Sequence, residues 1–115
     1  MMKNMILASQ DSLFLVNNAL FFKRFGYNVT NANDYFHAIN NIKTLADTNK
    51  KINILVIKSR LFSEEDEMQL HEILNIDKDI LIVILSDTKG KNDEHMLFLD
   101  YYSSPMEIID NLQKN

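Results

Sequence analysis

An apolar run crosses the middle of the chain with the sequence INILVIK, residues 52–58. Apart from Asn53, its residues before the last are aliphatic and do not alternate with polar ones. Such a continuous run is typical of a strand that is buried on both faces in a parallel sheet. The run ends in a charged residue, Lys58. Because ligands of open α/β sheets gather at the carboxyl ends of the strands, Lys58 stands at a candidate functional position.

Four further apolar runs flank this one, at residues 5–8, 27–30, 80–85 and 96–102. The segments between them carry apolar residues at the spacing of amphipathic helices. Continuous strands that alternate with such helices indicate a parallel sheet covered on both faces. With right-handed crossovers, the predicted fold is an α/β doubly wound five-stranded parallel sheet with the flavodoxin-like strand order 2-1-3-4-5.

The first helix has clear boundaries in the sequence. Residues 9–12 offer N-cap candidates, and Gly26 suits the left-handed position that follows a helix. The apolar spacing predicts a buried stripe that includes Leu13, Val16 and Leu20. Phe22 is out of phase with this stripe, so we expect its side chain to be exposed.

Start signals also mark the later helices. Asp34 is a cap candidate for the second helix, and Ser63 with Asp66 has the spacing of a capping box. Pro105 suits the first turn of a closing helix. Between the fourth and fifth strands, over the polar residues 86–94, we expect a shortened fourth helix, which is the weakest of the predicted elements. The apolar positions expected in the second and third helices are Phe36, Ile39, Ile42, Leu45, Met68, Leu70, Ile73 and Leu74.

Length and composition limit the classes of protein. The chain has 115 residues, and we expect a single domain over residues 1–115. It has no Cys, so nothing indicates an oxidising compartment, and we expect a cytoplasmic location. Its apolar stretches are shorter than the ~20 residues of a membrane helix. A net charge of −4 and scattered basic residues argue against direct nucleic-acid binding.

Several fragments of the chain match one family in order and spacing. The first helix runs into Gly26-Tyr27, the fourth strand runs into Ser86, and residues 100–105 read Asp-Tyr-Tyr-Ser-Ser-Pro. The chain resembles a bacterial response-regulator receiver domain of the CheY-like type over essentially its whole length. The family has a Gly-aromatic pair, a Thr or Ser, and an Asp-Tyr-apolar-Thr-Lys-Pro segment at these places.

The chain departs from the family where the family's chemistry lies. The acidic pair that holds Mg²⁺ in receivers falls on Ser9 and Gln10, and the phospho-acceptor aspartate falls on Lys58. The lysine that contacts the phosphoryl group falls on Ser104. Asp11 lies one place beyond the metal pair, and the register set by the Gly after the first helix argues against a slip.

The resemblance therefore implies a degenerate phosphorylation pocket. Mg²⁺ needs hard oxygen ligands, usually including carboxylates, and an ammonium group would stand where the cation should lie. We expect no bound metal, no cofactor and no aspartyl phosphate. The three histidines are far apart in the sequence, which also argues against a metal site. The residues that we assign to the degenerate pocket are Ser9, Gln10, Asp11, Lys58, Ser86 and Ser104.

Lys58 has three interpretations at this stage. In the first, its ammonium group pairs with Asp11 or forms a hydrogen bond to Ser86. In the second, the phosphorylation chemistry was lost, and the long side chain extends from the strand end into solvent. A Schiff-base nucleophile is the third, and no acid or base partner for it is evident.

The resemblance also implies an interaction face. Receivers bind partners and dimerise through the fourth helix region, the fifth strand and the last helix, which here brings in Tyr101, Tyr102 and Pro105. Ser86 and Tyr101 match the hydroxyl and aromatic positions that couple phosphorylation to this face. The matching loop of the family has a cis bond before proline, which implies one between Ser104 and Pro105.

We expect a non-enzymatic, phosphorylation-independent receiver of two-component signalling that acts through protein contacts. The partner is a kinase, another regulator or a fused output domain, and a homodimer fits the same face. Two alternatives remain. One is a small flavodoxin-fold enzyme or phosphocarrier that uses Lys58 or a serine, and the other is the N-terminal domain of a DNA-binding transcriptional regulator.

Overall fold

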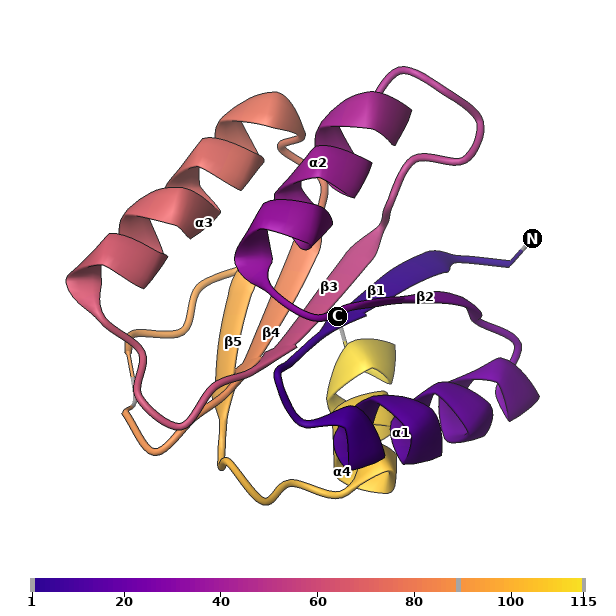
Figure 1. Cartoon of the computed structure of the whole chain (residues 1–115), viewed down its shortest axis with the longest axis vertical. Helices are drawn as coiled ribbons and strands as arrows, with labels where there is room; N and C mark the ends of the chain where they lie inside the picture. The colour runs from indigo at the N-terminus through magenta and orange to yellow at the C-terminus, as the bar shows by residue number, and fades with distance from the viewer. Residues whose placement is uncertain (1, 89, 115) are drawn as a thin grey trace.

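The computed structural model describes residues 2–88 and 90–114 and confirms the predicted α/β architecture (Figure 1). Its sheet has the strand order β2-β1-β3-β4-β5, and all neighbouring strands pair in parallel. The elements in chain order are β1 (Asn4–Ala8), α1 (Ser12–Arg24), β2 (Asn28–Ala32), α2 (Tyr35–Leu45), β3 (Ile54–Lys58), α3 (Glu64–Ile76), β4 (Leu81–Leu85), β5 (Met96–Leu99) and α4 (Pro105–Gln113).

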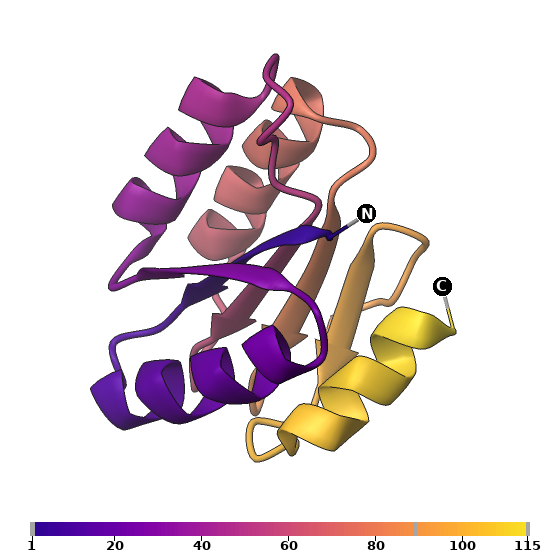
Figure 2. The same cartoon turned by 90° about the vertical axis from the view of Figure 1, so that its right-hand side faces the viewer.

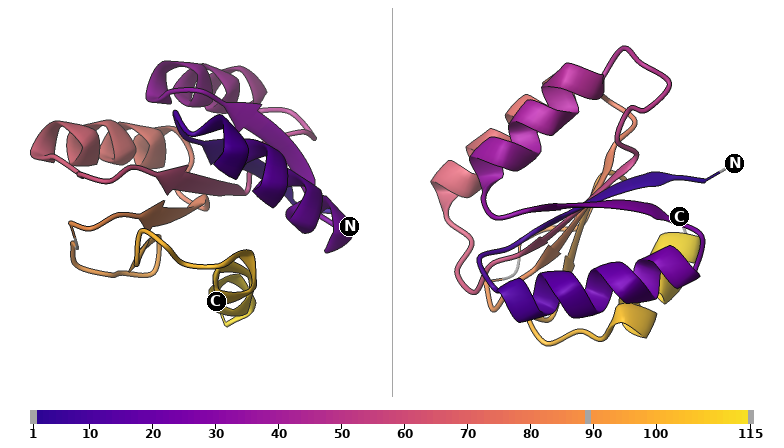
Figure 3. Two further views of the ribbon diagram at one scale, coloured as in Figure 1. Left: turned by 60° about the horizontal axis from the view of Figure 1, so that its bottom comes forward. Right: turned by 45° about the vertical axis from the view of Figure 1, so that its right-hand side comes forward.

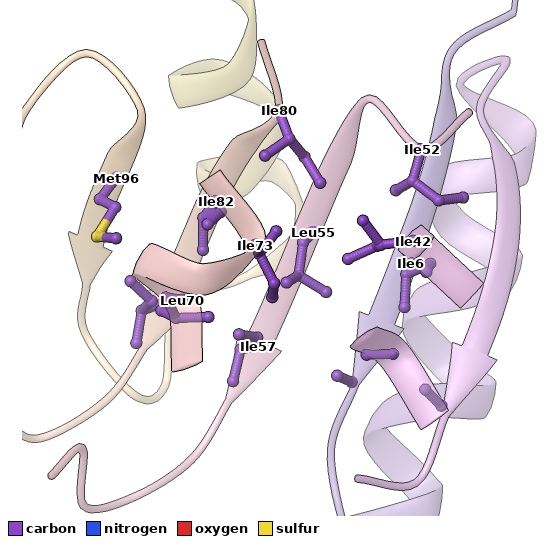
Figure 4. Close-up of a cluster of buried hydrophobic side chains, with 14 of the residues drawn as sticks. Ile6, Ile42, Ile52, Leu55, Ile57, Leu70, Ile73, Ile80, Ile82 and Met96 are labelled. Carbon is purple, nitrogen blue, oxygen red and sulfur yellow. The ribbon is translucent and has the colours of Figure 1, made fainter. Parts of the chain in front are cut away.

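The helices form two layers, one on each side of the sheet. Helices α2 and α3 lie on one face, and α1 and α4 lie on the other (Figures 2 and 3). The central strand β3 serves both layers, because successive side chains of a strand point to opposite faces. Leu55 and Ile57 belong to the cluster under α2 and α3 (Figure 4), whereas Ile54 and Val56 belong to the cluster under α1 and α4.

The apolar residues of helix α1 are not oriented as predicted. Phe22 is fully buried, although its position relative to the stripe predicted exposure. Leu13, Val16 and Leu20 are 74%, 56% and 56% exposed. The helix is apolar on two opposite sides, so the spacing of apolar residues did not determine which side faces the sheet. The buried side chains are Phe14, Leu15, Asn18, Ala19 and Phe22.

The ends of the helices follow their predicted caps. Asp11, Asp34 and Ser63 are the N-caps of α1, α2 and α3, and Ser63 forms the predicted capping box with Asp66. Gly26 has a φ of 93°, a left-handed backbone conformation that is strained in residues with a side chain. Phe36 and Met68 are 68% and 72% exposed and thus do not belong to the core.

The predicted shortened helix between β4 and β5 is not formed by the described residues of that connection. Side chains hold its backbone instead. Asn92 Oδ1 accepts a hydrogen bond from Phe98 N at 2.7 Å, and Asp93 Oδ1 accepts from His95 N and Met96 N. Gly, Asn and Asp favour turns over a helix, which accounts for the difference. Phe62 packs edge-to-face on Phe98 with the ring centroids 5.4 Å apart and helps to cover that part of the sheet.

Candidate functional site

A cavity of about 470 Å³ opens at the carboxyl ends of β1 and β3. It brings together four of the residues assigned to the degenerate pocket: Ser9, Gln10, Asp11 and Lys58. Ser86 and Ser104 are not among its lining residues. Sequence reasoning missed several others, of which Asn33, Asp34, Tyr35 and Arg60 carry polar groups.

The ammonium group of Lys58 faces aromatic rings. Its Nζ lies 4.6 Å from the ring centroid of Tyr101, 4.8 Å from that of Phe14 and 5.9 Å from that of Tyr102. Within the described part of the chain it has no ion pair with Asp11 and no hydrogen bond to Ser86, so neither contact of the pairing interpretation is formed. Lys58 is half-buried, and its charge is stabilised by the electron-rich ring faces rather than by water alone.

Arg60 is a second cation at this edge, and the sequence analysis missed it. Its Nη2 donates a hydrogen bond of 2.7 Å to the hydroxyl of Tyr102, and its Nη1 lies 3.6 Å from Asp87. The hydrogen bond to Tyr102, together with the charge of Asp87, raises the pKa of the guanidinium. The sequence could have indicated Arg60, because residues two apart along an extended chain point to the same side and Arg60 is two residues after Lys58.

Tyr101 and Tyr102 lie in the turn after β5 and not within the strand. Their rings meet edge-to-face with centroids 4.9 Å apart. Tyr101 is half-buried beside Lys58, whereas Tyr102 is 75% exposed. The two rings therefore connect the cavity with the outer surface of the molecule.

The polar residues at the end of β1 are engaged locally. The buried Ser9 hydroxyl accepts a hydrogen bond from Asp11 N at 3.0 Å. Asp11 Oδ1 accepts from Leu13 N and Phe14 N and so caps α1. Gln10 is exposed. The Asp11 carboxylate thus serves to start a helix.

The two remaining serines also have local partners. The Ser86 hydroxyl donates to the carbonyl of Arg60 at 3.0 Å and accepts from Thr88 N. Ser104 caps α4 and forms a capping box with Glu107. The described residues contain no cis peptide bond, so the cis Ser104–Pro105 bond implied by the resemblance is wrong. Pro105 opens α4 as predicted.

The side of the cavity near α2 carries a second carboxylate and a phenol. Asp34 accepts hydrogen bonds from the backbone and the side chain of His37, which lowers the pKa of its carboxyl. The Tyr35 hydroxyl is buried and has no hydrogen-bond partner among the described residues. Burial, and secondarily the charge of Asp66, raises the pKa of the Tyr35 phenol.

Metal-ligating side chains do not cluster in the described residues: no three of His, Asp or Glu come together as a site. His37, His71 and His95 are each near a carboxylate of their own segment. None of the helices in residues 2–88 and 90–114 is long and apolar enough to cross a membrane.

The chain matches no protein-family model and no curated protein sequence. It is similar in structure to solved receiver domains. A receiver domain protein (CheY-like) from Methanospirillum hungatei superposes with a TM-score of 0.77 at 11% identity, covering 99% of this chain and 93% of that one. A response regulator receiver protein from Sinorhizobium medicae gives 0.77 at 18% identity, with 98% and 93% covered.

A third neighbour is the CheX–CheY complex from Borrelia burgdorferi, solved with BeF3 and magnesium. Its TM-score is 0.73 at 12% identity, and the match covers 97% of this chain and 87% of that one. At these identities the likeness is one of fold. The chain has the five-stranded parallel architecture of response-regulator receiver domains, with four helices in its described residues.

Proposed function

We propose that this chain is a receiver-like signalling module that is not phosphorylated and acts by binding protein partners. One observation carries the proposal: an ammonium group, Lys58, stands at the end of β3 and is surrounded by the rings of Phe14, Tyr101 and Tyr102. We take this position as the one that corresponds to the phospho-acceptor aspartate of receivers.

The neighbouring residues support the loss of phosphorylation. An amine cannot form the acyl phosphate that a carboxylate forms, and Ser9 and Gln10 offer only neutral oxygens to a divalent cation. The Ser9 hydroxyl is turned to a backbone amide, and the Asp11 carboxylate caps α1. None of these groups is arranged to hold a metal beside a phosphoryl group.

The same residues suggest how the module works without a phosphate. Lys58 fixes the ring of Tyr101, and Arg60 fixes the ring of Tyr102 by a hydrogen bond. These contacts keep both aromatic side chains in one arrangement at the sheet edge. We define Tyr101, Tyr102 and Pro105 as the aromatic face. Exposed tyrosine beside an arginine is typical of interface centres, which favours a protein partner.

Mass spectrometry tests the loss of phosphorylation. Incubation with acetyl phosphate and Mg²⁺ should leave the chain at its original mass, and the single variant Lys58→Asp should also stay unmodified. Only the triple variant Ser9→Asp, Gln10→Asp, Lys58→Asp restores a full set of carboxylates, and we expect modification in that variant alone. An increase of about 80 Da on the unaltered chain, the mass of one phosphoryl group, contradicts the proposal.

A binding experiment tests the aromatic face. Tyr102→Ala should reduce recovery of the partner from the native cell extract, whereas Phe36→Ala, an equally exposed aromatic on α2, should not. Addition of a phosphodonor should change neither result. Equal recovery by the two variants counts against the face, while dependence on the phosphodonor counts against the mechanism.

The cavity supports a second candidate function, the non-covalent binding of a small anion. Both carboxylates that line the cavity, Asp11 and Asp34, accept hydrogen bonds at helix N-termini. Among residues 2–88 and 90–114, the charge of Lys58 has only aromatic rings as partners. Calorimetric titration with orthophosphate tests this candidate. Heat that disappears in Lys58→Gln supports it, and heat that persists in that variant, or none in the unaltered chain, rejects it.

A further inference from the structure

The outer side of α1 carries an apolar stripe that the core does not use. Leu13, Val16 and Leu20 are 74%, 56% and 56% exposed and follow one another at the spacing of one helix side. Figure 3 shows α1 on the outside of the molecule, with its outer side uncovered. Single exposed apolar residues are ordinary, but three in line along one helix form a continuous patch.

We infer that this stripe is the contact surface for a second copy of the chain, through an antiparallel pairing of two α1 helices. The inference goes beyond the proposed function, because the stripe consists of other residues than the aromatic face and needs neither Lys58 nor Tyr102. A helix that is apolar on two opposite sides normally buries both, and the sheet buries only the side that carries Phe22.

The positions of the apolar residues fit a twofold axis. The midpoint between Leu13 and Leu20 falls between Val16 and Asn17. An axis at that point places Leu13 of one copy against Leu20 of the other, and the Val16 side chains of both copies beside the axis. A twofold contact requires such self-complementarity, since each residue must meet its counterpart reciprocally.

The charges at the ends of α1 select the antiparallel direction. Lys23 and Arg24 lie in the last turn, both exposed, and have no ion pair within the described residues. The opposite end begins with Asp11, and the first turn holds no basic residue. Antiparallel pairing brings the cationic end of each helix to the end of the other that carries the N-cap carboxylate, and it sets the two helix dipoles in opposite directions, which is favourable. Parallel pairing would place four cations together.

A single helix side is small next to the ~1,600 Å² of a standard interface, so we expect a weak dimer that depends on protein concentration. Sedimentation velocity on the purified chain should show a shift from monomer to dimer with rising concentration. Leu20→Glu should weaken the dimer at least tenfold, with an unchanged far-UV circular dichroism spectrum. Phe36→Glu, at an exposed aromatic on another helix, should leave it intact.

Matched charge variants test the direction. Ser12 is exposed in the first turn of α1, and antiparallel pairing places it close to the Lys23 of the second copy. Ser12→Glu should therefore strengthen the dimer, and Ser12→Lys should weaken it. Equal effects of the two variants would contradict the pairing.

Cross-linking gives the sharpest test, because the chain has no cysteine of its own. Val16→Cys lies beside the axis and should form a disulfide between copies on oxidation. Lys23→Cys should not, since two such residues are about 20 Å apart along an antiparallel pair with a 1.5 Å rise per residue. The inference is overturned if the unaltered chain stays monomeric at all concentrations, or if its dimer persists in Leu20→Glu and is lost in Tyr102→Ala.

Discussion

The ammonium group of Lys58 lies between three aromatic rings, and this contact should contribute measurably to stability. Lys58→Gln keeps most of the length of the side chain and removes the charge. We expect it to lower the free energy of unfolding by about 1 kcal/mol, the size of a partly exposed cation–π contact. Urea unfolding followed by circular dichroism measures the loss. Lys58→Arg keeps the cation and should remain close to the unaltered chain, whereas equal losses in both variants would assign the effect to packing.

The Asp34 carboxylate should make the stability of the fold depend on pH. Hydrogen bonds from His37 lower the pKa of Asp34 in the folded state below the unfolded value of about 3.9. The ionised cap therefore stabilises the fold above that value, and this contribution is lost as the pH falls through the lower folded pKa. Asp34→Asn caps without a charge. The difference between the urea midpoints of the two chains should be larger at pH 7 than at pH 3, and a constant difference would argue against the effect.

Residue types were more predictable than residue partners. The positions of Ser9, Gln10 and Lys58 at strand ends were readable from the chain, because strand ends and helix caps fix the register. The partner of Lys58 was not, since the rings come from α1 and from the turn after β5, far away in the sequence. Asp11 does not pair with Lys58, because its carboxylate accepts hydrogen bonds from the backbone amides of the first turn of α1.

At the scale of the element, α1 offers a direct test of its orientation. Phe22 is fully buried, so Phe22→Ala should lower the free energy of unfolding by about 3–5 kcal/mol. Leu20 is 56% exposed, and Leu20→Ala should cost far less. Chemical unfolding at a low protein concentration, where self-association does not contribute, compares the two. A larger loss for Leu20 would return the helix to the orientation that its apolar spacing suggested.

Elements with one strong signal were predictable, and those with two competing signals were not. The strand β4 is a continuous aliphatic run, and the capping box at Ser63 starts α3 as expected. In α1 two apolar stripes compete, and the spacing of apolar residues does not distinguish between them. Between β4 and β5 the residues Gly90, Asn92 and Asp93 favour turns, and the described residues of this connection do not form the short helix that we expected there.

At the scale of the whole molecule, the strand order follows from general rules. Alternating strands and helices with right-handed crossovers leave few arrangements, and the order β2-β1-β3-β4-β5 is one of them. The same rules place the ends of β1 and β3 beside each other, which is why Ser9 and Lys58 line one cavity. What such rules do not supply is the chemistry in that cavity, which depends on side chains from loops.

The two hydrophobic clusters should behave as one cooperative unit, because alternate residues of β3 belong to each. Ile73 of α3 is fully buried, and Ile109 of α4 is almost fully buried. Replacing either with alanine should cost about 2–5 kcal/mol and lower the stability of the whole chain rather than of one layer. Circular dichroism and tyrosine fluorescence should then report a single coincident transition for each variant. Separate transitions for the two probes would show that the two layers unfold independently. A structural change at the Lys58 end of the sheet would then not pass from one layer to the other.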